Sequence, residues 1–98
     1  MSEKERYQYQ QKMKAQLDVW KADVDKLRAK ASGKSADAKL KLDQHLKDLE
    51  MRIDEGKAKL AELAAASEDA WDSVKEGIES TWGSLKSAIK DASAKFKE

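Results

Sequence analysis

Apolar residues recur every three or four positions from Met13 to Phe96, and no proline interrupts them. Alternating steps of three and four keep apolar side chains on one face of a helix, which is the repeat of helices that pack side by side. Ala, Glu, Lys, Leu and Arg make up just over half of the chain, a composition typical of long helices and coiled coils. The sequence therefore predicts an all-α protein, and it excludes a sheet protein or a Rossmann-type nucleotide fold.

The apolar positions divide into three helical stretches, which we expect near residues 3–31, 36–66 and 68–97. Ser2 with Glu5 three residues later is the pattern of a capping box, and Ser35 and Ser67 are suitable starts for the other two helices. Residues 32–35, followed by the second stretch, predict the tip of an antiparallel coiled-coil hairpin. The apolar seam of this hairpin consists of Met13, Leu17, Trp20, Val24, Leu27, Leu42, Leu46, Leu49, Ile53, Leu60 and Leu63.

Two helix boundaries stay open at this level. The seam keeps its phase across Gly33, and one glycine costs only about 1 kcal/mol inside a helix, so a continuous helix competes with the predicted break. Residues 64–66 are all alanine, which does not end a helix, so residues 36–97 form either one helix or two. The single domain 1–98 is therefore a three-helix bundle if the third stretch folds back, and an oligomeric helical bundle if it does not.

The third stretch carries a row of bulky apolar side chains, which we call the Trp stripe. Its members are Trp71, Val74, Ile78, Trp82, Leu85, Ile89 and Phe96. If the stretch runs straight on, nothing in its own chain covers this stripe, which must then meet another subunit, a partner or a lipid surface. The opposite face carries serines, an arrangement similar to helices that insert into lipid surfaces. Packing in a core or an oligomer is the main expectation, and lipid binding the alternative.

No residue pattern indicates catalysis or metal binding. The chain has no cysteine, His45 is its single histidine, and its four glycines are isolated, so neither a metal-ligand set nor a phosphate loop is predicted. Twenty basic and nineteen acidic residues give a net charge of +1. The basic excess lies in residues 1–34 and is too weak for a nucleic-acid footprint. We expect no enzyme, cofactor, metal or small-molecule substrate.

The N-terminal segment places aromatic residues beside basic ones. Tyr7 and Tyr9 precede Lys12 and Lys14, which is a rudimentary platform for stacking nucleic-acid bases. The hairpin register instead brings Tyr9 close to Gly56, a seam position without a side chain, where an aromatic ring would fill the space. We therefore expect Tyr9 to pack within the protein.

The start of the chain has no apolar segment resembling a signal peptide, and its longest apolar run, residues 63–66, is too short to span a membrane. These features predict a cytoplasmic protein.

The tail contains Ala70-Trp71, then Gly77 six residues after that tryptophan, then Trp82 and Leu85. With this motif, residues 9–27 and 60–96 resemble small, largely uncharacterised bacterial coiled-coil proteins, some of them labelled stress-response proteins. Relatives usually keep helix formers where this chain has Ser-Gly-Lys-Ser at 32–35. The resemblance implies a link to stress response and supplies no catalytic residues.

The sequence thus predicts a non-enzymatic coiled-coil interaction or structural protein. Its partner would be a second copy, giving a homo-oligomer, or another helical protein, docked through the Trp stripe. The alternative is reversible binding of a membrane or lipid surface by the same stripe. A weaker alternative is a nucleic-acid accessory protein that uses the basic first third.

Overall fold

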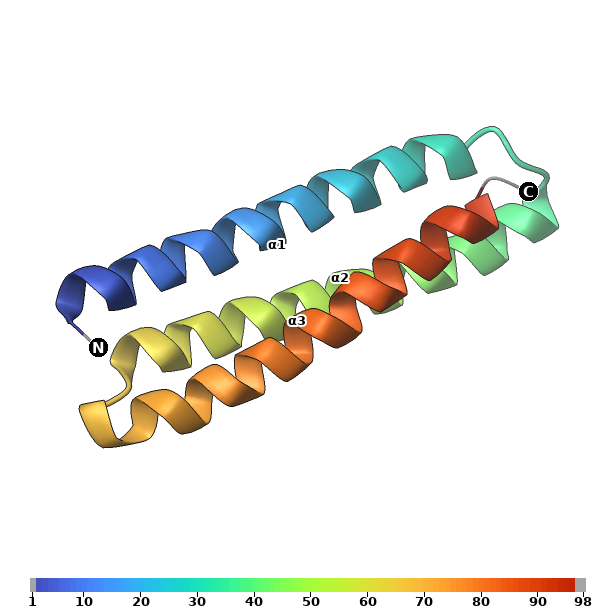
Figure 1. Ribbon diagram of the computed structural model, residues 1–98. Helices are drawn as coiled ribbons and strands as arrows, with labels where there is room; N and C mark the ends of the chain where they lie inside the picture. The colour runs from blue at the N-terminus through green and yellow to red at the C-terminus, as the bar shows by residue number, and fades with distance from the viewer. Residues whose placement is uncertain (1, 97–98) are drawn as a thin grey trace.

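The chain folds into an up-down-up bundle of three helices over residues 2–96, the range that the computed structural model describes (Figure 1). α1 spans Glu3–Ala31, α2 spans Ala36–Ala65 and α3 spans Glu68–Phe96. The bundle is a rod measuring 51 × 18 × 17 Å. The predicted all-α fold is confirmed, and of the two predicted architectures the chain adopts the three-helix bundle. The predicted end of the third helix at residue 97 lies outside the described residues.

Local capping starts the first helix where the sequence predicts. The Ser2 hydroxyl accepts the backbone N–H of Glu5 at 3.2 Å and donates to the Glu5 carboxylate at 3.1 Å. Glu3 and Glu5 lie in the first turn, and Arg28 and Lys30 lie in the last. Negative charge at the N-terminus and positive charge at the C-terminus both stabilise the helix dipole.

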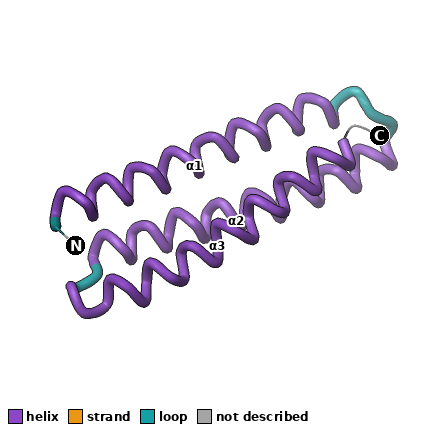
Figure 2. The backbone as a smooth tube through the Cα atoms, viewed as in Figure 1, coloured by secondary structure: helices purple, strands orange, loops and turns teal. Residues whose placement is uncertain are grey.

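The predicted break between α1 and α2 is confirmed, and hydrogen bonds of two serines stabilise the helix ends on either side of it. Figure 2 shows the connection as one of two short loops. Gly33 does not take a positive φ, so it is not the left-handed cap that a glycine after a helix often forms. Instead, Ser32 donates to the carbonyl of Ala29 at 2.7 Å, and Ser35 is extended with ψ 160° while its hydroxyl accepts the N–H of Ala38 at 3.5 Å.

The second connection consists of only Ala66 and Ser67. Ala66 is extended, with ψ 139°, and its N–H donates to the carbonyl of Leu63 at 3.1 Å. The Ser67 hydroxyl accepts the N–H of Ala70 at 3.3 Å and so caps α3. Residues 36–96 are therefore two helices, and the second folds back along the first.

The core lies along the common axis of the three helices. Its side chains are apolar, each at most 7 % exposed, and no buried residue among those described is polar or charged. The seam residues Trp20, Leu42 and Leu60 are half-buried at its edge. The fully packed members are Met13, Leu17, Val24, Leu27, Ala31, Leu46, Leu49, Ile53, Leu63, Trp71, Ile78, Trp82, Leu85, Ile89, Ala92 and Phe96.

Trp82 fills the space above Gly56 in the middle of the rod. A Cβ atom built on Gly56 would lie 3.0 Å from Leu17 Cδ2 and 3.2 Å from Trp82 Cη2. The indole Nε1–H of Trp82 donates to the carbonyl of Met13 at 3.3 Å, and its ring lies 6.3 Å from that of Trp20. Trp82 of α3 therefore contacts α2 at a glycine and is held to α1 by a hydrogen bond.

The expectation that Tyr9 lies close to Gly56 and fills this space is wrong. The aromatic ring at this position is Trp82, because α3 folds back into the groove between α1 and α2. Tyr9 lies nearer the start of the rod, where its ring meets the edge of Trp71 at 6.2 Å.

We predict opposite effects of alanine at two helical glycines. Gly83→Ala should raise the free energy of unfolding by about 0.5–1 kcal/mol, because a Cβ there meets nothing within 4 Å and the unfolded chain loses flexibility. Gly56→Ala should lower it by about 1–3 kcal/mol, because the pinned Trp82 ring and the buried Leu17 cannot move aside. Urea unfolding followed by circular dichroism measures both. Equal stabilisation by the two substitutions would contradict the packing of Trp82 on Gly56.

Candidate interaction surface

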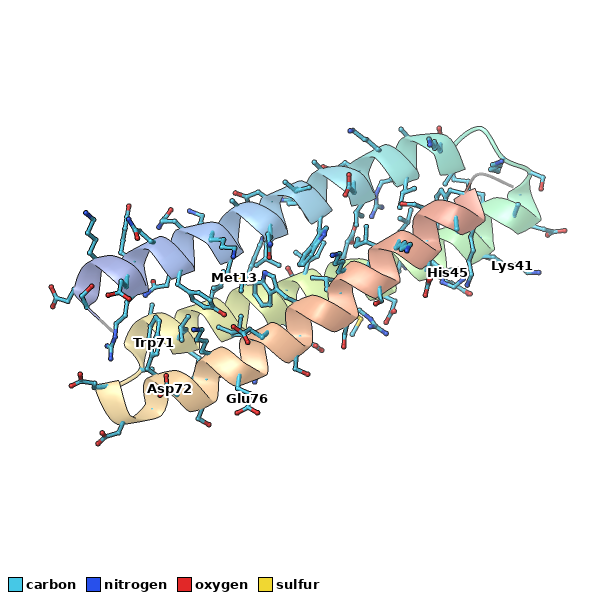
Figure 3. The ribbon with its side chains drawn as sticks, viewed as in Figure 1. Met13, Lys41, His45, Trp71, Asp72 and Glu76 are labelled. Atoms are coloured by element: carbon cyan, nitrogen blue, oxygen red, sulfur yellow. The ribbon has the colours of Figure 1, made fainter. Side chains whose placement is uncertain are left out.

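The Trp stripe is turned into the bundle, so it is not an open surface. Val74 is half-buried and the other six members are each at most 6 % exposed. Figure 3 shows Trp71 on the inner side of α3, toward α1. Interaction with a partner through this stripe would first require α3 to leave the bundle.

Near the start of the rod, the rings of Tyr9 and Trp71 are also occupied, whereas Tyr7 is 64 % exposed. The Arg6 guanidinium lies over the Trp71 ring, 4.7 Å from its centroid, and the Lys75 ammonium lies 5.0 Å from the centroid of Tyr9. The Tyr9 hydroxyl donates to Glu79 Oε1 at 3.4 Å. Tyr9 is therefore packed within the protein, as expected, and stacked between side chains rather than open to a nucleic-acid base.

These surroundings raise the pKa of Tyr9 from 10.0 to about 12. Burial is the largest cause, because it disfavours the charged phenolate; the negative charge of Glu79 and the hydrogen bond to it add to the effect. The folded state thus holds the phenol proton more tightly than the unfolded chain does. The stability this group contributes is complete below pH 10.0 and is lost as the pH rises toward about 12.

We predict that the phenolate absorbance of Tyr9, measured in a Tyr7→Phe background, appears with a midpoint at about pH 12. Glu79→Gln should lower this midpoint only in part, because burial remains. Between pH 10.0 and about 12, the unfolding free energy of the wild type should fall more steeply than that of Tyr9→Phe. A midpoint near 10 would contradict the contact with Glu79.

Within residues 2–96, no three His, Cys, Asp or Glu residues lie close enough together to hold a metal ion. No helix in this range is long and apolar enough to cross a membrane. His45 is exposed, and its Nε2 accepts a hydrogen bond from Lys95 Nζ at 3.4 Å.

Basic side chains gather where the hairpin tip meets the end of α3. Residues 26–47 and 86–96 hold ten basic and three acidic residues, and we call this end of the rod the basic tip. Arg28 is ion-paired with Glu50 at its margin. The basic residues are Lys26, Arg28, Lys30, Lys34, Lys39, Lys41, Lys47, Lys86, Lys90 and Lys95.

The opposite end of α3 is acidic. Residues 67–79 hold five acidic residues and one lysine. Figure 3 shows the two groups at different ends of the rod, with Lys41 and His45 at one and Asp72 and Glu76 at the other. The positive charge of the molecule is therefore concentrated at the basic tip, away from the acidic start of α3.

Sequence reasoning missed the basic tip because its parts lie far apart in the chain. Residues 26–47 and 86–96 meet only because α3 folds back and ends beside the hairpin tip (Figure 1). A net charge counted over thirds of the chain divides the tip among all three parts. The lysines of residues 86–97 were visible as a group, and adding the hairpin topology to them would have revealed the tip.

Two grooves at the basic tip combine cations with exposed apolar atoms. The first lies between the start of α2 and the end of α3, has a volume of about 450 Å³ and, among the described residues, no carboxylate in its lining. It is lined by Lys34, Ala38, Lys41, Leu42, His45 and Lys95. The second lies on the α1 side of α2, where Leu40 is 62 % exposed beside Lys39 and Lys47.

No family model matches the chain, and no curated protein or solved structure is significantly similar to it. The predicted membership of a stress-related coiled-coil family therefore stays a prediction. The proposal for its function therefore rests on the surface of the bundle.

Leu40 should be free of any role in stability. We predict that Leu40→Gln changes the free energy of unfolding by at most about 0.5 kcal/mol, because the side chain lies in solvent. Leu46→Ala, at a fully buried position of the same helix, should cost about 2–5 kcal/mol. Thermal and urea unfolding measure both. A loss of more than about 1 kcal/mol in Leu40→Gln would place Leu40 in the core and remove it from the candidate surface.

Proposed function

We propose that the protein is a non-enzymatic helical interaction protein that acts as a closed bundle and binds a negatively charged partner through its basic tip. The observation that carries this proposal is the gathering of ten basic residues, from all three helices and the hairpin connection, at one end of the rod. Such a concentration attracts anionic partners even though the whole chain has a net charge of only +1.

Exposed apolar atoms within the basic tip support a contact surface rather than a merely solvated end. Leu40 is exposed, and Leu42 is half-buried in the groove with Lys34 and Lys41. Single exposed apolar residues are common on proteins, as Val19 and Met51 illustrate here. Leucines surrounded by cations additionally offer a partner apolar contact beside charge attraction.

The closed bundle also favours the outer surface over the Trp stripe. A partner helix or lipid that uses the stripe must replace the contacts of α3 with α1 and α2, including the hydrogen bond from Trp82 to Met13. The tip requires no such opening. We keep a cytoplasmic location and a stress-linked role in a bacterium within the proposal, because the composition and the resemblance of the tail support them.

Charge variants at the two ends test this proposal. We expect Lys34→Gln/Lys41→Gln/Lys95→Gln to elute from a sulfonate cation-exchange resin at clearly lower salt than the wild type. The control is Lys4→Gln/Lys12→Gln/Lys14→Gln, which has the same net charge and removes exposed lysines from the other half of α1. It should elute close to the wild type, because the tip is intact. Elution of the two variants at the same salt concentration would show that net charge alone determines binding to the resin, and would overturn the proposal.

Self-association by exchange of α3 is a second candidate. Its supporting observation is the two-residue connection Ala66-Ser67, preceded by Ala64 and Ala65, which favour helix. If this connection straightened, α2 and α3 would form one rod, and the Trp stripe would pack into the groove of a second copy with the same contacts. Such domain swapping forms dimers at low cost in stability.

Glu68→Pro distinguishes the swapped dimer from the closed bundle. Proline is favoured in the first turn after an N-cap, so the closed bundle accepts it, whereas inside a continuous helix it costs about 3 kcal/mol or more. If the wild type is partly dimeric by light scattering, the variant should shift to the 11.0 kDa monomer with unchanged helicity. A wild type that is monomeric at every concentration, or a dimer that persists in Glu68→Pro, would contradict the exchange.

A further inference from the structure

The groove between α2 and α3 at the basic tip brings cations together from three segments. Lys34 comes from the hairpin connection, Lys41 from α2 and Lys95 from α3. Lys95 Nζ donates to His45 Nε2 at 3.4 Å, which links α3 to α2 across the groove. Because no carboxylate among residues 2–96 lines the groove, its ammonium groups are available to an external anion.

The floor of this groove is apolar. Ala38 and Leu42 of α2 lie between the lysines. On the other side of the same helix, Leu40 is exposed beside Lys39 and Lys47. Residues two apart on a helix face different directions, so the tip presents a leucine beside basic side chains on two of its flanks, with Asp43 also lining the groove at Leu40.

A flat layer of phosphate groups above an apolar phase matches this arrangement. The layer can surround the end of a rod 18 × 17 Å across and reach both flanks at once. Apolar side chains of surface-bound helices enter roughly 5–10 Å into the boundary between headgroups and acyl chains. Leu40 and Leu42 lie within the first two turns of α2 and so within about that depth of the tip.

Nucleic acid matches the tip less well. Nine of its ten basic residues are lysines, whereas recognition of nucleic acid favours the planar guanidinium of arginine. Binding of single strands also uses exposed aromatic rings on which bases stack. Phe96 is buried, and it is the one Phe, Tyr or Trp residue at this end among those described.

We propose that the basic tip docks the closed bundle end-on to an anionic phospholipid surface. Headgroup phosphates occupy the groove of Lys34, Lys41 and Lys95, and Leu40 enters the boundary with the acyl chains. This inference rests on the proposed function and names its partner. It differs from lipid binding by the Trp stripe, because Trp71 and Trp82 stay inside the bundle throughout.

Vesicle co-sedimentation with the full chain tests the docking. The probes are vesicles of phosphatidylcholine alone and vesicles with about one third phosphatidylglycerol, at about 0.1 M salt. We expect the wild type to bind the anionic vesicles at least about tenfold more tightly than the neutral ones. The fluorescence emission of Trp71 and Trp82 should not shift on binding, since the bundle stays closed.

Matched variants locate the contact. Lys34→Gln/Lys41→Gln/Lys95→Gln should lose at least about tenfold in affinity for the anionic vesicles, while Lys4→Gln/Lys12→Gln/Lys14→Gln stays within about twofold of the wild type. Leu40→Gln should weaken binding several-fold without changing its salt dependence. Met51→Gln removes an equally exposed apolar residue, 64 % exposed, from the middle of α2 and should have no effect.

Three results would overturn the lipid assignment. Anionic vesicles bound equally by the wild type and the tip variant would place the contact elsewhere. A blue shift of tryptophan emission on binding would show that the Trp stripe opens onto the lipid. Failure to bind anionic vesicles, combined with tip-dependent binding of a single-stranded oligonucleotide, would overturn the lipid assignment and leave the proposed function standing. If, in addition, the tip variant and its control eluted from the cation-exchange resin at the same salt concentration, both the lipid assignment and the proposed function would be overturned.

Discussion

The contact of Trp82 with Gly56 is the constraint on which the rest of this fold depends. One indole ring, 4 % exposed, packs on the glycine of α2 and is fixed by a hydrogen bond to the carbonyl of Met13 in α1. It joins all three helices near the middle of the rod. The register it sets for α3 determines which side chains of that helix are buried and which charges reach the hairpin tip.

The two tryptophans of α3 hold the helix unequally. Trp82 has a partner for its indole N–H, whereas the buried Nε1 of Trp71 has none among the described residues. A buried donor without a partner costs about 1–3 kcal/mol, which the cation–π contact of Arg6 and the edge-on contact of Tyr9 with Trp71 offset in part. The beginning of α3 is therefore less well fixed than its centre, and opening of the bundle should start there.

The helices could be predicted from the sequence, because their signals are local. Apolar steps of three and four, together with serine caps at Ser2 and Ser35, place α1 and the start of α2 at their observed bounds. The turn at Ala66 could not be predicted in this way, since alanine favours helix and only burial of the Trp stripe outweighs that preference. The packing of Trp82 on Gly56 and the basic tip both depend on this fold-back of α3. Because the turn at Ala66 stayed open, neither feature could be predicted.

The length of the rod gives its charge separation a particular meaning. Electrostatic interactions in physiological salt extend only about 8 Å, whereas the rod is 51 Å long. An approaching partner therefore senses one end at a time, and the net charge of +1 describes neither end. To its surroundings the molecule is a cation at the basic tip and carries nearly balanced charge at the other end, so an anionic partner is attracted when the basic tip arrives first.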